Sequence, residues 1–173
     1  MFIKLFGAML ILVSGTSIGW IISNVYLNRV KELKDLQLAL SILETEISYG
    51  QTILFEALKK TSALISQPLS SLFLLAAEKL KDSRKESFAD IWEKELAQYK
   101  SNCDLLNEDL EILKNWGQQI GCSDLSNQIK INQLAIKRLE QQEKKAEEIA
   151  KKKVKISRYS GLLISLMVII LFY

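Results

Sequence analysis

The stretch LKDLQLALSILETEISYGQTILFEAL, residues 33–58, decides the fold. Its first apolar residues recur at alternating steps of three and four, which places them on one face of a helix; they are Leu33, Leu36, Leu40, Leu43 and Ile47. Gly50 is a helix stop and Thr52 fits an N-cap, after which Leu54, Phe55 and Leu58 resume the pattern. The stretch therefore predicts a helical hairpin.

Similar stripes continue along the chain. Pro68 fits the first turn of a third helix, and Ser87 followed by Asp90 resembles a capping arrangement for a fourth. A fifth helix ends at Gly121, and Ser123 or Asp124 caps a sixth. The stripes on the third, fourth and fifth helices are predicted to be core rather than ligand pocket; they comprise Leu69, Leu72, Phe73, Ala76 and Leu80, then Phe88, Ile91, Trp92 and Tyr99, then Leu106, Leu110, Leu113, Trp116 and Ile120.

The composition favours an all-α protein without catalytic chemistry. Seven glycines and one proline leave little material for the turns of a sheet. The chain has no histidine, which removes the commonest general base and metal ligand. Cys103 and Cys122 have no metal-ligand or disulfide-framework spacing, so we expect reduced packing residues. No phosphate-binding, dinucleotide or metal motif occurs, and we expect no catalytic residue, cofactor or metal.

Both ends are apolar. Leu5 to Ile22 carries only Ser14, Thr16 and Ser17 as polar residues, and about 18 residues cross much of a bilayer. Small residues in this segment would let another membrane helix approach closely; they are Gly7, Ser14, Gly15 and Gly19. A cleaved signal peptide is the alternative, with Lys4 as its basic start and 14–17 as its small-residue stretch.

The C-terminal apolar tail, Gly161 to Tyr173, is short for a span. Arg158 can snorkel and Tyr159 fits the interface, so we favour spanning over lying flat. The last helix is predicted to begin near Leu125 and to run without a breaker into this tail, with Glu–Lys pairs four apart, Glu140 with Lys144 first among them.

Basic residues near the apolar ends predict the orientation. The C-terminal tail is preceded by a basic segment and followed by no charge; the segment comprises Lys151, Lys152, Lys153, Lys155 and Arg158. Arg29, Lys31 and Lys34 follow the first apolar segment. We therefore expect transmembrane helices at 1–23 and 158–173 and a cytosolic helical bundle at 24–157. With a net charge of only +3, nucleic acid is not an expected partner.

The chain resembles the stage III sporulation protein AB family over nearly its whole length. The resemblance rests on Gly15 to Trp20 followed by Tyr26 and Arg29, and on three long strings: LALSILETEISYGQTILFEAL at 38–58, PLSSLFLLAAEKL at 68–80 and IGCSDLSNQIK at 120–130. The segment SYGQTILFEALKK also resembles, more weakly, the hairpin of the type II secretion system F (platform protein) domain.

This resemblance implies a bundle of about six helices in a membrane component of the sporulation channel complex between mother cell and forespore. It implies the mother-cell-derived outer forespore membrane, with the bundle in the mother-cell cytosol. The implied partners are a secretion-type ATPase like stage III sporulation protein AA and other channel subunits. The residues leave the oligomeric state open, a homo-oligomer included. Five residues of the family strings are candidates for partner contact or hairpin geometry: Glu44, Glu46, Tyr49, Gly50 and Glu56.

Two other functions remain open on the residues alone. A cleaved signal would give a secreted or surface helical domain with a C-terminal membrane anchor. A membrane enzyme acting on lipid or peptidoglycan would need a catalytic carboxylate or serine, and no residue is nominated. Glu44 and Glu46 fall two apart and so point to different faces of a helix, which disfavours a carboxylate pair sharing a proton.

Overall fold

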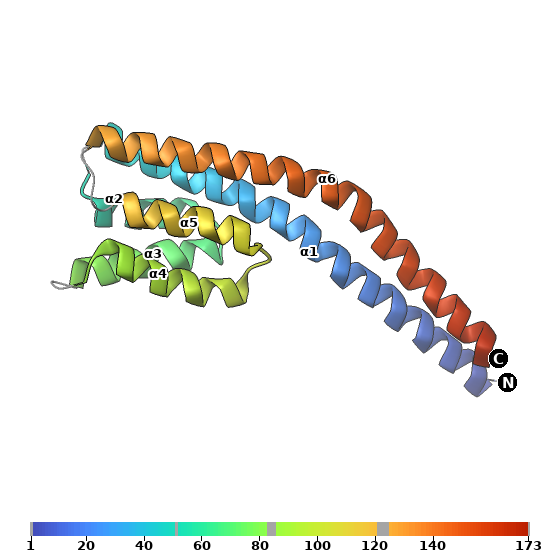
Figure 1. Cartoon of the computed structure of the whole chain (residues 1–173). Coiled ribbons are helices and arrows are strands. Elements are labelled where there is room, and N and C mark those ends of the chain that lie inside the picture. The colour runs from blue at the N-terminus through green and yellow to red at the C-terminus, as the bar shows by residue number, and fades with distance from the viewer. Residues whose placement is uncertain (1, 51, 83–85, 121–124, 173) are drawn as a thin grey trace. The chain divides into compact units, whose positions relative to one another are not determined.

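The computed structural model describes residues 2–50, 52–82, 86–120 and 125–172, with side chains for 6–50, 52–82, 86–120 and 126–171 (Figure 1). Within these ranges the chain is helical and has no strand. The elements are α1 (Phe2–Ser48), α2 (Leu54–Leu64), α3 (Leu69–Asp82), α4 (Phe88–Tyr99), a 3₁₀ turn η1 (Lys100–Asn102), α5 (Asn107–Ile120) and α6 (Leu125–Phe172). The predicted all-α class is confirmed.

The chain divides into two compact units. The first, which we call the helix pair, contains residues 1–30 and 145–173; the second, the bundle, contains residues 31–144. Each long helix contributes to both units, so the apolar ends are continuations of bundle helices and not separate elements. The membrane boundaries expected at residues 23 and 158 stay a prediction.

The bundle is built on the predicted α1 stripe. Leu33, Leu36, Leu40 and Leu43 have no exposed surface, and Ile47 is 6% exposed. Helix α2 packs on α3, α3 on α4 and α4 on α5 (Figure 1). The hairpin between α1 and α2 is therefore present, with its apolar face turned to the core.

The prediction that Thr52 caps α2 is wrong. Ile53 occupies the N-cap position in extended conformation and makes no side-chain cap hydrogen bond. The Thr52 hydroxyl instead donates to Glu46 Oε2 across 3.5 Å. The physical reason is that a tertiary carboxylate competes with the local helix end for this hydroxyl, and a sequence pattern shows only the local end.

Of the other predicted helix starts, one is confirmed and one is shifted by a residue. The amide of Asp90 donates to Ser87 Oγ at 3.3 Å, which confirms the predicted cap of α4. Pro68 lies immediately before α3 instead of inside its first turn. The predicted stop at Gly121, the cap at Ser123 or Asp124, and Cys122 lie outside the described residues.

An aromatic cluster fills the bundle between α3, α4 and α5. The ring centroids of Trp92 and Trp116 lie 4.8 Å apart, and Phe73 and Phe88 contact both indoles. A Cβ built on Gly117 would lie 2.0 Å from Trp92 Cδ1, so only glycine fits beneath that ring. The aromatic side chains predicted as core are buried. Aromatic residues bury a large apolar area per side chain, which favours this arrangement.

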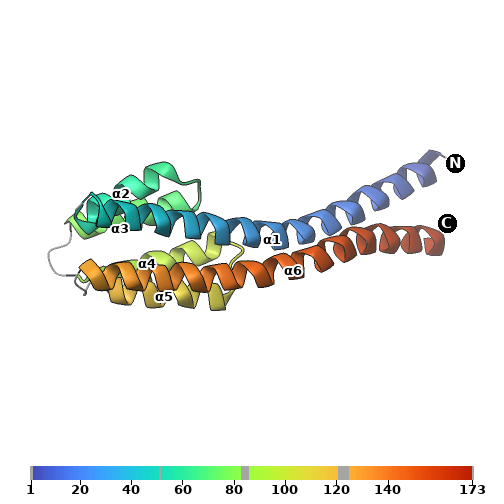
Figure 2. The same cartoon turned by 90° about the horizontal axis from the view of Figure 1, so that it is seen from above.

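The helix pair uses the opposite kind of contact. Within it, α1 and α6 run side by side (Figure 1 and Figure 2) and approach through small residues. A Cβ on Gly19 would lie 2.6 Å from Ser157 O, and a Cβ on Gly161 would lie 2.5 Å from Gly15 O. Backbone-to-backbone approach of this kind needs glycine at the contact.

Both long helices are long and apolar enough to cross a membrane. Only 11% of the apolar window in α1 and 6% of that in α6 is buried, whereas the core helix of a soluble protein is mostly buried. The helix pair exposes large apolar side chains; those above 60% exposed are Phe6, Met9, Ile21, Ile156, Tyr159, Leu163, Ile164, Met167, Ile170 and Leu171.

Candidate functional site: the α1–α2 hairpin

The carboxylate of Glu44 joins α1 to α6. Gln133 Nε2 donates to Glu44 Oε1 at 2.7 Å, and Asn132 Nδ2 donates to Oε2 at 3.2 Å. The same Asn132 amide donates to Leu40 O at 2.8 Å, and its oxygen accepts from the Trp116 indole at 3.0 Å. Glu44 is therefore part of an internal network that connects three helices, and its carboxylate is already engaged.

Asn132 is the polar residue that sequence reasoning missed. It is 2% exposed, although asparagine is seldom buried without partners. The sequence could have predicted its burial, because Asn132 lies three residues after Ile129 and four before Ile136, on the apolar face of the last helix. A buried amide with all of its partners in place favours one register of neighbouring helices over others.

Glu46 joins α1 to α2. Its Oε2 pairs with Lys60 Nζ at 2.7 Å and accepts from the Thr52 hydroxyl, and its backbone oxygen accepts from the Thr52 amide at 3.4 Å. Lys60 is half exposed, so this ion pair contributes at most about 1 kcal/mol. The main structural effect of Glu46 is to hold the turn between α1 and α2 in its geometry.

Gly50 lies at the turn for reasons of space. A Cβ there would lie 2.5 Å from Thr52 Oγ1 and 2.6 Å from Glu46 O. No described glycine has positive φ, so close approach takes the place of the left-handed conformation that a turn glycine suggests.

Tyr49 and Glu56 face solvent. Tyr49 is 88% exposed, the adjoining Ile53 is 66% exposed, and Glu56 is exposed in the first turn of α2. We call these three side chains the hairpin tip. Exposed large residues of this kind are typical of contact surfaces. Of the five sequence candidates, three lie in internal contacts, Glu44, Glu46 and Gly50, whereas Tyr49 and Glu56 are exposed.

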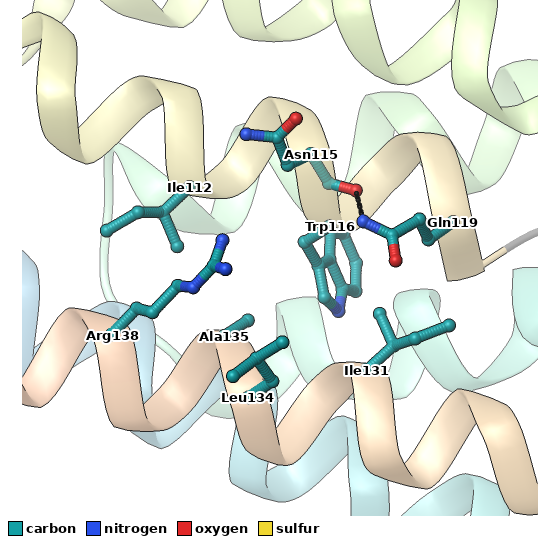
Figure 3. Close-up of a pocket in the computed structure, with 8 residues that line it drawn as sticks. All are labelled: Ile112, Asn115, Trp116, Gln119, Ile131, Leu134, Ala135 and Arg138. Atoms are coloured by element: carbon teal, nitrogen blue, oxygen red, sulfur yellow. Dashed lines mark hydrogen bonds between the residues drawn. The ribbon is translucent and has the colours of Figure 1, made fainter.

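Two hollows lie near this region. A groove between α1 and α6 is lined by Ser41, Glu44, Thr45, Ser48, Tyr49, Ile129 and Gln133. A smaller pocket lies between α5 and α6, where Figure 3 shows Trp116 and Arg138 among its lining side chains. Neither holds a cluster of ligating residues: no group of three or more His, Cys, Asp or Glu side chains suited to a metal occurs in the part of the chain described.

A half-buried acidic junction connects α1 with the loop before α5. The Asp104 amide donates to both oxygens of Glu32, at 3.0 and 3.2 Å. Burial, opposed by that hydrogen bond and helped by the nearby carboxylates of Asp104, Asp35 and Asp109, raises the pKa of Glu32 to about 6. The Tyr99 hydroxyl close by has no hydrogen-bond partner among the described residues, and burial raises its pKa. The sequence pattern does not predict this contact, because the two residues lie 72 positions apart.

Cys103 is a free thiol and half buried. Burial raises its pKa, and the neighbouring Glu32 carboxylate raises it further. A thiol with a raised pKa is a poor nucleophile at neutral pH, because the thiolate is the reactive form.

The basic segment on α6 is exposed. Lys151, Lys152, Lys153, Lys155 and Arg158 all present their side chains to the surroundings. Arg158 Nε also lies 3.3 Å from the buried Ser23 Oγ, to which it donates across the helix pair. The predicted ion pair between Glu140 and Lys144, which precedes this segment on α6, forms at 2.9 Å.

Comparison with known proteins identifies the family. The sequence profile of the family described as stage III sporulation protein AB matches residues 4–173. A protein of Bacillus subtilis (strain 168) named stage III sporulation protein AB is 33% identical over 169 residues, which cover 98% of each chain. A solved structure of stage III sporulation protein AB superposes with a TM-score of 0.66 at 32% identity, covering 71% of this chain and 96% of that one. The chain belongs to the stage III sporulation protein AB family, a family of sporulation proteins.

Proposed function

We propose that this protein is a non-catalytic platform component of the sporulation channel complex between mother cell and forespore. In this role the bundle couples a cytosolic secretion-type ATPase to membrane subunits. The observation that carries the proposal is the combination of two features. The apolar ends of α1 and α6 are exposed, and the buried polar groups of the bundle around Asn132 bond to one another. Membership of a sporulation family supports the setting.

The helix pair supports a retained membrane anchor. Gly15 and Gly19 pack against Gly161, Ser165 and the backbone of Ser157. Cleavage of a signal near Ser17 would remove half of these contacts and leave a single short apolar tail. The close packing therefore favours the anchored arrangement over the secreted one.

The hairpin tip supports partner contact at the α1–α2 turn. Tyr49, Ile53 and Glu56 are exposed, whereas Glu44 and Glu46 hold the turn in place through Asn132, Gln133 and Lys60. An exposed tyrosine loses little conformational entropy on binding, because only two torsions of its side chain are free. We propose Tyr49 and Glu56 as contact residues and Glu44, Glu46 and Gly50 as residues of hairpin geometry.

Co-purification tests the partner. A tagged chain is isolated in mild detergent from membranes of sporulating cells, and the ATPase is expected in the eluate. Tyr49→Ala combined with Glu56→Ala should remove the ATPase while the chain stays folded. Gln98→Ala combined with Glu111→Ala, also at exposed positions, is the matched control. Equal recovery with both double variants would reject the hairpin tip, and no recovery with the unaltered chain would reject the ATPase.

Cysteine labelling tests the orientation. Cys103 is a poor reporter because it is half buried and its pKa is raised. Gln98→Cys in a chain with both native cysteines changed to serine provides an exposed thiol. A membrane-impermeant maleimide should label it only after the cells are opened. Labelling in intact cells would place the bundle outside the cytosol and end the proposal.

A further inference from the structure

We propose that the basic segment on α6 binds the headgroups of anionic phospholipids, and so gives this protein a shell enriched in them. The inference deepens the proposed function, because it rests on the helix pair lying in a membrane. It starts from how the charge of the chain is divided between its two units.

The helix pair concentrates positive charge. It carries eight lysines and arginines against two glutamates, a net charge of +6, whereas the bundle carries 15 against 18, a net charge of −3. The total of +3 conceals this division. No acidic residue follows Glu148, so Lys153, Lys155 and Arg158 have no acidic residue within four positions of them in sequence.

The cations of the basic segment are available to a ligand. All five side chains are exposed, and none of them forms an ion pair within the described residues. Lys144, seven residues before Lys151, differs in this respect, since it is paired with Glu140 at 2.9 Å. The charge of the basic segment is therefore left for a group outside the chain.

The arrangement fits a lipid surface better than an acidic protein. Successive helix positions turn by about 100°, so Lys151, Lys152 and Lys153 point in three different directions. A protein partner contacts one face of a helix, whereas lipid headgroups surround it. Anionic headgroups on the cytosolic leaflet attract basic residues beside a span, and the attraction falls off within about one Debye length.

The neighbouring residues place this charge at the edge of the apolar region. Ile156 and Tyr159 are 62% and 68% exposed, and the apolar tail follows directly. Arg158 donates to Ser23 Oγ on the adjacent apolar helix. Cations with flexible stems at such a boundary reach phosphate while their methylene groups stay in contact with apolar surroundings.

The test measures lipid selectivity of the full chain. The protein is reconstituted in phosphatidylcholine vesicles that contain phosphatidylglycerol as the minor lipid. Spin-labelled phosphatidylglycerol and spin-labelled phosphatidylcholine then report how much of each is immobilised at the protein. We expect a several-fold preference for phosphatidylglycerol at about 0.1 M salt and a smaller preference at about 1 M salt, where the Debye length is shorter.

Two quadruple variants distinguish the effect of the basic segment from the effect of the overall positive charge. Changing Lys151, Lys152, Lys153 and Lys155 to glutamine should reduce the preference to near one. Changing Lys59, Lys81, Lys130 and Lys137 to glutamine removes the same charge from exposed bundle positions and should leave the preference unchanged. A preference that survives the first set, or that both sets reduce equally, overturns the proposal.

Extraction with alkaline carbonate tests whether the helix pair spans the membrane, separately from its lipid preference. Release of the unaltered chain from membranes would mean that the helix pair does not span, and the proposed function fails with it. A chain that stays in the membrane but shows no preference for phosphatidylglycerol overturns the lipid proposal alone.

Discussion

The helix pair and the bundle are made from the same two long helices, yet one has its apolar side chains outside and the other inside. In the bundle, α1 presents Leu36 and Leu40 to the core with no exposed surface. In the helix pair, α1 and α6 meet through Gly15, Gly19 and Gly161, and the large apolar side chains point outward.

The proposed membrane position of the helix pair accounts for this inversion. In water, the free energy of burial favours large apolar side chains at the contact, at about 25 cal/mol per Å². Among lipid tails that gain disappears, and close backbone packing between small residues takes its place. A single continuous helix can therefore follow both rules, one in each half.

The largest effect is expected in the bundle at Gly117. Gly117→Val places a branched side chain against the buried Trp92 ring, which already donates to Leu113 O at 2.9 Å. Overpacking of a filled core should lower the free energy of unfolding by about 3 kcal/mol. Urea unfolding followed by tryptophan fluorescence measures this. The neighbouring Gln118→Val is exposed and should cost well under half as much; similar losses at both positions would refute the packing argument.

The next effect concerns the polar network of the bundle. Asn132→Leu leaves the Trp116 indole without its acceptor and removes the amide bonded to Leu40 O and Glu44. Leaving a buried donor unpaired should cost about 2 kcal/mol. Asn127→Leu, at an exposed position of the same helix, controls for helix propensity. Unfolding measurements that show no difference between the two leucine variants would mean that the network adds no stability.

A smaller effect is expected in the helix pair. Gly19→Leu puts a side chain where a Cβ would lie 2.6 Å from Ser157 O, so the helices must separate. Gly7→Leu is the matched control, because nothing lies within 4 Å of a Cβ there. Hydrogen exchange in detergent should become several-fold faster for amides of 150–160 in the first variant only, with the bundle amides unchanged. Faster exchange throughout the bundle would show that the units are not independent.

The smallest effect is a dependence on pH. The pKa of Glu32 rises from 4.5 to about 6 on folding, mainly through burial, so ionising it in the folded state costs free energy. Its stabilising contribution is therefore fully present below about pH 4.5 and is lost as the pH rises through about 6. Glu32→Gln removes this dependence, so its stability relative to the unaltered chain should increase over that window by at most about 1 kcal/mol, because the carboxyl is half exposed.

Urea unfolding of both proteins at pH 4.5 and pH 7.5 measures this difference. Glu78→Gln, at an exposed carboxylate of α3, serves as the control for general charge. A constant gap between Glu32→Gln and the unaltered chain at the two pH values would contradict the assignment.

The sequence by itself determined the helices, the stripe of α1, the cap at Ser87 and the apolar ends, because each depends on residues within a few positions of one another. The family strings likewise needed no structure. Only the tertiary structure decided which of Glu44, Glu46, Tyr49, Gly50 and Glu56 have internal partners, because those partners lie up to 89 residues away in sequence. It also decided that Thr52 bonds to Glu46 and that Glu32 meets Asp104. Periodicity reports which face of a helix is apolar, but hydrogen bonds between distant helices depend on how those faces are brought together.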